Sequence, residues 1–140
     1  MKKFFSHIAL FALLLLLSAC AVLRPGPTPV SENPAVLTLV EQARAEAAEN
    51  KLQSAVATIE RAQRLEPRNP WLWQELARLH LAQGDHAQAE SLAARSNTWA
   101  GSDPALRAAN WRLIGAARAA RGDAVGAQAA EARAVELERR

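Results

Sequence analysis

From residue 34 onward, apolar and polar residues alternate with the three-to-four-residue spacing of amphipathic helices, and short breaks divide this pattern into six segments. Three breaks place a capping side chain directly before a proline, which is tolerated at the first position of a helix: Asn33-Pro34, Asn69-Pro70 and Asp103-Pro104. The other breaks read as turns: Asn50-Lys51, Gly84-Asp85 and Gly122-Asp123. The pattern predicts three helix-turn-helix units, with helices at about 34–49 and 52–65, 70–83 and 86–97, and 104–121 and 124–140.

The first 33 residues follow a different pattern. Lys2 and Lys3 precede an unbroken apolar run from Ile8 to Leu17, which is shorter than the roughly 18 residues that a membrane span needs. A basic start, a short apolar run and small residues before a cleavage site are typical of a secretory signal. The next residues contain three prolines and a glycine without periodicity, which indicates a semi-extended linker. We expect a cleaved signal at 1–19, a segment of Cys20 and linker at 20–33, and a helical domain at 34–140.

The run Leu17-Ser18-Ala19-Cys20 resembles the signal of bacterial lipoproteins, in which a leucine and two small residues precede the cysteine that takes the lipid. Cys20 is the chain's single cysteine, so it has no disulfide partner within the chain. The resemblance implies a covalent lipid on Cys20. It also favours the outer membrane, with the domain facing the periplasm, because Ala21 stands where an aspartate would suggest retention at the inner membrane. The alternative is an ordinary cleaved signal with a chance cysteine.

The helical units resemble the tetratricopeptide repeat, a helix pair of about 34 residues with an early aromatic, a leucine followed by a small residue, and small residues in the second helix. The matching positions in the second unit are Trp73, Leu76, Ala77, Gly84, Ala89 and Ser96, and those in the third are Trp111, Ile114, Gly115, Gly122, Ala127 and Ala134. The first unit matches less well, with Gln42 where leucine is expected. The resemblance implies an all-α fold in which units at about 34–69, 70–103 and 104–140 stack as a short right-handed solenoid.

The second and third units are offset by four more residues than the first and second. These residues fall within 97–103, where we expect a longer loop or an added turn on the fifth helix. Trp99 takes a place that usually holds leucine, so we expect it to be buried beneath this loop.

Charge and chemistry narrow the possible functions. Without the signal, fifteen basic residues face fourteen acidic ones, so the formal charge is +1 and a nucleic-acid partner is unsupported. His80 and His86 stand where the repeat usually carries an aromatic residue, which favours packing over catalysis or metal binding. No serine or threonine lies in a nucleophile motif. Residues 122–126 read as an inter-helix turn that runs into the next helix, not as a phosphate-binding loop. We therefore expect no enzymatic activity, no metal, no small-molecule substrate and no cofactor besides the lipid.

In tetratricopeptide arrays the first helix of each pair lines a concave groove. The stripe expected to face it consists of Leu37, Val40 and Arg44, then Trp71, Gln74, Arg78 and Leu81, then Arg112, Ala116 and Ala119. Arg44, Trp71, Gln74, Arg78 and Arg112 are the candidate partner-binding residues, because guanidinium groups beside an indole could hold an extended peptide. Trp71 could instead cover the end of the linker, and the arginines could face solvent by chance.

These features favour a non-enzymatic, lipid-anchored periplasmic scaffold that binds another envelope protein. The layout of lipid signal, short linker and small repeat domain is similar to that of the LpoP-type lipoproteins, which activate bifunctional penicillin-binding proteins and so regulate peptidoglycan synthesis. The linker, at most roughly 40 Å long, is short for reaching an inner-membrane synthase. One alternative is therefore a pilotin-like assembly factor for a secretin or pilus component. Another is a structural subunit that assembles through its alanine-rich helix faces.

Overall fold

The computed structural model describes residues 30–139; the signal, Cys20 and most of the linker lie outside this range. The described part consists of helices and turns without strands. Its helices are α2 (Pro34–Ala48), α3 (Leu52–Leu65), α4 (Pro70–Gln83), α5 (His86–Trp99), α6 (Pro104–Ala120) and α7 (Ala124–Glu138). None of these helices has the length and apolar character that crossing a membrane requires.

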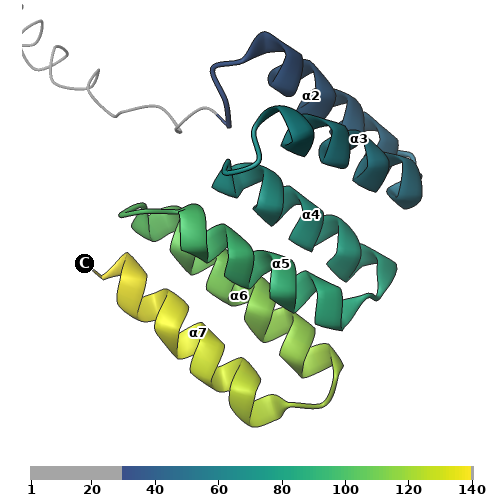
Figure 1. Cartoon of the computed structure of the whole chain (residues 1–140). Coiled ribbons are helices and arrows are strands. Elements are labelled where there is room, and N and C mark those ends of the chain that lie inside the picture. Colours follow the sequence, from purple (N-terminus) through teal and green to yellow (C-terminus); the bar gives the residue numbers. More distant parts are fainter. Residues whose placement is uncertain (1–29, 140) are drawn as a thin grey trace, which may run out of the picture.

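The helices form three hairpins that stack in chain order (Figure 1). The α3–α4 and α5–α6 turns lie at the same edge of the stack as the start of α2 and the end of α7. The turns within the hairpins lie at the opposite edge. The prediction of three helix pairs in an all-α fold is confirmed, with helix ends within two residues of those expected.

Local side chains start and stop the helices as the sequence indicates. The side-chain oxygens of Asn33, Asn69 and Asp103 accept hydrogen bonds from backbone N–H groups in the first turn at 3.0, 2.9 and 3.0 Å. Gly84 and Gly122 both have φ of +84°, a left-handed conformation that glycine adopts without a steric penalty. The added turn expected on the fifth helix is present: α6 has 17 residues against 14 in α4, whereas α5 has the same 14 residues as α3.

The core lies between the stacked hairpins. Its largest fully buried apolar side chains are Ile59, Leu72, Leu106, Val36 and Val40. Trp73 and Trp111 are half-buried at its margin, and both pack against core side chains. The Trp73 indole also donates a hydrogen bond of 3.0 Å to the carbonyl of Pro67 and lies 4.4 Å from the guanidinium of Arg95.

A buried polar network joins the second and third hairpins. Asn110 on α6 is fully buried and accepts a 3.0 Å hydrogen bond from the Gln74 amide on α4. Its own amide donates to the Ser96 hydroxyl at 2.7 Å and to the Asn97 side chain at 3.0 Å. Ser96 in turn donates to the carbonyl of Pro70 at 2.8 Å. Three helices are therefore held together by satisfied polar groups in the interior.

Small residues allow α6 and α7 to approach closely, as expected for Gly115 and Ala127. A Cβ atom on Gly115 would lie 3.3 Å from the carbonyl oxygen of Ala127 and 3.5 Å from the Cβ of Ala130. Because one of these neighbours is backbone, a larger side chain can be accommodated only by moving the helices apart. Ala89, which in the second unit takes the repeat position of Ala127, is fully buried.

Replacing Gly115 with leucine is expected to lower the free energy of unfolding by about 2 kcal/mol, the typical cost of overpacking. Ala116→Leu is the matched control, since it adds a similar side chain to the same helix at an exposed position and should change stability by less than about 0.5 kcal/mol. Urea unfolding of both variants measures the difference. Equal effects would contradict the close helix packing at Gly115.

Candidate functional site

A groove opens between α2 and α4, with α3 contributing to its floor. It has a volume of about 360 Å³, and we call it the α2–α4 groove. Its lining residues are Ala43, Arg44, Ala47, Leu52, Ile59, Glu75, Arg78, Leu79 and Ala82. The lining combines small and aliphatic side chains with two arginines and one glutamate, an arrangement suited to an apolar segment that carries charge beside it.

Arg44 lies in this groove but its charge is already balanced. Its guanidinium contacts the carboxylate of Glu41 at 2.8 Å and that of Glu75 at 3.1 Å. Burial acts to lower the pKa of Arg44, but the hydrogen bonds and charges of Glu75 and Glu41 outweigh it and raise this pKa overall. Glu75 was not among the predicted site residues, although its i, i+3 spacing from Arg78 places both on one helix face.

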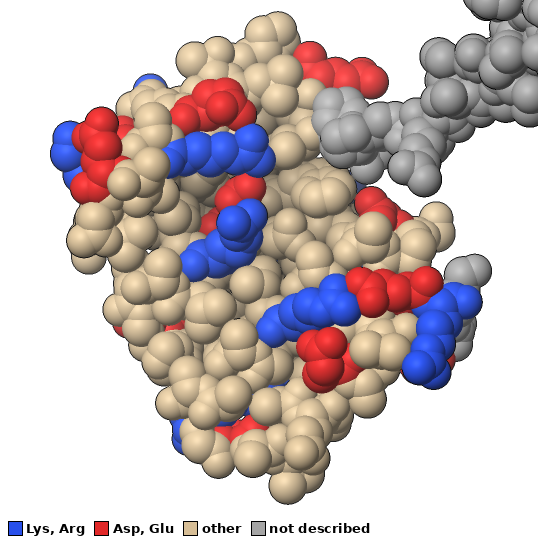
Figure 2. Space-filling view, turned by 180° about the vertical axis from the view of Figure 1, so that it is seen from behind, with Lys and Arg blue, Asp and Glu red and all other residues tan. Residues whose placement is uncertain are grey.

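Both arginines of the groove are exposed, but they differ in whether a carboxylate neutralises their charge. No carboxylate of residues 30–139 forms an ion pair with the guanidinium of Arg78, whereas Arg44 has two such partners. The structure thus brings Arg44 and Arg78 to one groove on neighbouring first helices, as the 34-residue spacing predicts. On the face that Figure 2 shows, basic side chains mostly lie beside acidic ones, so this face has no extended patch of one sign.

Arg112 is held against the C-terminal helix and does not line the groove. Its guanidinium contacts both carboxylate oxygens of Glu138, at 2.5 and 2.8 Å, and lies 3.4 Å from Glu131. The hydrogen bond with Glu138 is the main cause of the raised pKa of Arg112, and it lowers the pKa of the Glu138 carboxyl. Arg112 thus joins α6 to α7, a pairing that sequence spacing alone did not indicate.

Two residues of the predicted stripe face inward instead. Gln74 is 8% exposed and its amide bonds to Asn110, and Val40 is 1% exposed within the core. The prediction that both face the groove is wrong, because Gln74 bonds to Asn110 on α6 and Val40 packs within the core cluster. Of the remaining predicted stripe, Leu37, Ala116 and Ala119 are exposed and Leu81 is half-buried.

Trp71 lies at a different site from the arginines. It is half-buried and lines a shallow depression with Val30, Arg68 and Pro70 at the α3–α4 turn. This position agrees with the alternative in which Trp71 covers the end of the linker. Trp99 is 40% exposed, so the prediction that it is buried is wrong. The reason is that α5 continues to Trp99, which places this residue at the helix end instead of under the loop.

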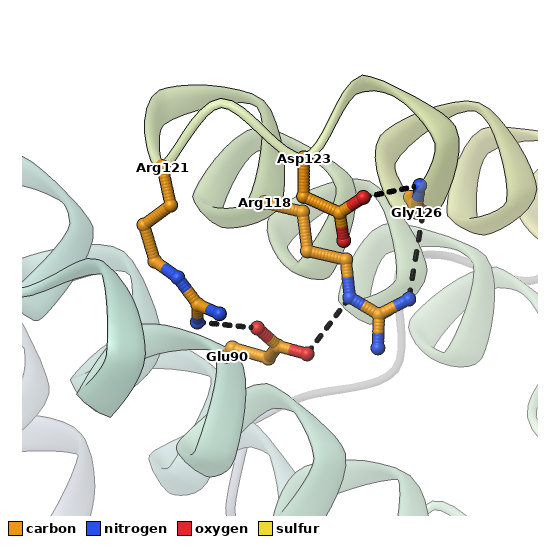
Figure 3. A network of polar contacts seen from close by, with 5 residues as sticks. All are labelled: Glu90, Arg118, Arg121, Asp123 and Gly126. Carbon is orange, nitrogen blue, oxygen red and sulfur yellow. Dashed lines mark hydrogen bonds and ion pairs between the residues drawn. The ribbon is translucent and has the colours of Figure 1, made fainter.

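The turn before α7 belongs to a polar cluster that stabilises the fold (Figure 3). Glu90 on α5 accepts hydrogen bonds from Arg118 on α6 and from Arg121, which directly follows α6, at 2.8 and 2.9 Å. Asp123 accepts one of 2.8 Å from the backbone N–H of Gly126 and so caps α7. Gly122 and Asp123 form the turn and residues 124–126 begin α7, which confirms the interpretation of 122–126 as an inter-helix turn that runs into the next helix.

His80 and His86, the two histidines within residues 30–139, are not grouped with other side chains that could bind a metal ion. His80 is half-buried, with its Nδ1 atom 3.3 Å from the Asp85 carboxylate. The Nδ1 atom of His86 is buried without a hydrogen-bond partner. Over residues 30–139, no three histidine, cysteine, aspartate or glutamate side chains are grouped as a metal ion would require.

Comparison with known proteins finds the same helix-pair architecture in a repeat family and in several solved structures. A family model for the tetratricopeptide repeat matches residues 39–110. Among solved structures, the globular C-terminal domain of P. aeruginosa LpoP is 42% identical, with a TM-score of 0.72 over 74% of this chain and 98% of that domain. The Sgt2 tetratricopeptide domain from Aspergillus fumigatus is 26% identical, with a TM-score of 0.68 over 81% of this chain and 72% of that one.

A third structure, the second tetratricopeptide domain of Spaghetti (RPAP3) bound to an HSP90 peptide, is 17% identical. Its TM-score is 0.65 over 74% of this chain and 93% of that one, a likeness of fold alone. No curated protein matches the chain.

Proposed function

The chain belongs to the tetratricopeptide-repeat family, and from this premise we propose that it is a lipid-anchored scaffold of the bacterial envelope that activates a bifunctional penicillin-binding protein. The observation that carries this proposal is the likeness to the LpoP domain, at 42% identity over 98% of that domain. LpoP-type lipoproteins regulate peptidoglycan synthesis. An activator of a penicillin-binding protein needs to bind that protein but needs no catalytic group of its own. A repeat fold that serves as a scaffold suits this role.

The α2–α4 groove is the proposed binding site. Its alanine-rich lining leaves room for a segment of the partner, and Arg78 supplies a positive charge that no residue of the described chain neutralises. The guanidinium of Arg44 is fixed by ion pairs with two carboxylates, so we assign it a structural role in the groove. Arg78 then remains available to bind the partner. Opposite charge on the partner would favour both encounter and orientation.

Lipid on Cys20 is the proposed anchor, and the inner face of the outer membrane is the proposed location. Nine residues lie between Cys20 and Val30, so the two are at most about 35 Å apart even when the chain is fully extended. The domain must therefore stay near the membrane that holds Cys20. A penicillin-binding protein anchored in the inner membrane would have to extend most of the distance to reach it.

Activation provides the direct test. Purified lipidated protein is mixed with the bifunctional penicillin-binding protein of the same organism, and the rate of glycan-strand polymerisation is measured from labelled lipid II. We expect an increase that saturates with the concentration of the scaffold. Binding without any change in rate would contradict the activating role, and absence of binding would contradict the choice of partner. Co-purification with a secretin instead would favour the pilotin-like function.

Arg78→Glu is expected to weaken binding to the penicillin-binding protein about tenfold, because the groove would present a negative charge in place of its unpaired positive one. The melting temperature should stay within a degree or two, since Arg78 is exposed. Arg61→Glu is the control, an identical charge reversal at an exposed position of α3 that does not line the groove. Equal binding by the two variants would exclude the groove as the binding site.

A further inference from the structure

The edge at which the chain enters the domain carries exposed apolar side chains. We call it the tether edge and define it by Leu65, Arg68, Trp71 and Trp99. Leu65 is 52% exposed and Trp99 is 40% exposed. They end helices α3 and α5, both of which terminate at the edge where α2 begins (Figure 1).

A single arginine links the exposed indole to the start of the domain. The guanidinium carbon of Arg68 lies 5.3 Å from the centre of the Trp99 ring. Arg68 and Trp71 also line the shallow depression that Val30 borders. No carboxylate of the described residues pairs with Arg68, so an apolar surface and an unneutralised positive charge occur together at this edge.

The linker is fastened to the same edge. The Asn69 amide donates a 2.7 Å hydrogen bond to the carbonyl of Val30, and the Ser31 hydroxyl donates one of 2.6 Å to Glu66. Asn69 also donates to the second carboxylate oxygen of Glu66 at 2.6 Å, which closes this small network. These bonds fix the point from which the chain leaves the domain toward Cys20.

We propose that the tether edge rests on the membrane surface, with Trp99 and Leu65 in the headgroup layer and Arg68 beside lipid phosphates. This inference rests on the proposed lipid anchor at Cys20. Tryptophan favours the boundary between apolar and polar layers, and guanidinium groups bind phosphate strongly. The contact area is small, but the short tether holds the edge near the bilayer at an effective concentration in the millimolar range.

Such docking sets the direction in which the groove points. Ala47 and Ala82, which line the α2–α4 groove, lie near the ends of α2 and α4 at the edge opposite the tether edge. With the tether edge on the membrane, this part of the groove faces into the periplasm and remains open to a partner approaching from the inner membrane.

Depth-dependent fluorescence quenching tests the proposal. The full-length lipidated protein is reconstituted into vesicles of phosphatidylethanolamine and phosphatidylglycerol at about 3:1, with a fraction of brominated acyl chains. We expect Trp99 to account for most of the quenched fluorescence, so Trp99→Phe should reduce quenching at least twofold and Trp111→Phe should leave it nearly unchanged. Leu65→Gln should also reduce it. Val125→Gln, an equivalent change at an exposed residue of the opposite edge, should not.

Vesicle flotation of the same samples separates the two proposals. Protein that floats but shows no stronger quenching at Trp99 than at Trp111 would overturn the docking of the tether edge and leave the lipid anchor intact. That outcome would also be expected if this edge bound a protein instead of a membrane. Protein that does not float would overturn the anchor, and the docking inference with it.

Discussion

Replacing Asn110 with alanine is expected to lower the free energy of unfolding by about 3 kcal/mol. The side chain is fully buried and takes part in three hydrogen bonds that connect α4, α5 and α6. Its removal leaves the buried Gln74 amide without an acceptor, at about 1–3 kcal/mol, and also creates a small cavity. For a domain of this size the melting temperature should fall by about 10 °C.

Asn97→Ala is the matched control for Asn110→Ala. Asn97 is half-buried and accepts one bond of this network, while the Asn110 amide would still donate to Ser96. We expect the free energy of unfolding to fall by less than about 1 kcal/mol. The double variant should lose no more of this free energy than the two single variants lose together. Thermal and urea unfolding measure all three. If Asn110→Ala were no more destabilising than Asn97→Ala, the network would not join the second and third hairpins.

Replacing Cys20 with alanine is expected to abolish lipid-mediated membrane association, because alanine lacks the thiol that takes the lipid. Each methylene of a lipid chain buried in the bilayer contributes about 0.8 kcal/mol, so two or three acyl chains make attachment effectively permanent. The variant should appear in the soluble fraction or as unprocessed precursor. Membrane fractionation measures the first outcome and intact-protein mass spectrometry the second.

Ala21→Asp provides the control for the anchor, since it keeps the lipidated cysteine and changes the residue expected to govern sorting. We expect this variant to stay membrane-bound but to move from outer-membrane to inner-membrane fractions. If signal cleavage and membrane association survived Cys20→Ala, the lipid assignment would be wrong. If Ala21→Asp left the distribution unchanged, the assignment to the outer membrane would have to be revised.

The groove residues show where prediction from the sequence succeeds and where it stops. The 34-residue spacing of Arg44 and Arg78 correctly places them on neighbouring helices, because a regular repeat carries equivalent residues to equivalent positions. Gln74 fails as a groove residue because its amide is taken up by Asn110 on the next hairpin. Arg112 is likewise engaged by Glu138, which lies 26 residues later in the chain.

The sequence by itself determined the helices, their pairing and most of their ends, since periodicity, asparagine and aspartate caps and left-handed glycines act within a few residues of chain. The tertiary structure alone decided which polar side chains remain free. Whether Gln74 or Arg112 finds a partner depends on residues of another helix, and the outward position of Trp99 depends on how far α5 continues. Such long-range pairing leaves no local signal, because the groups that meet are separated by many residues and brought together only by hairpin stacking.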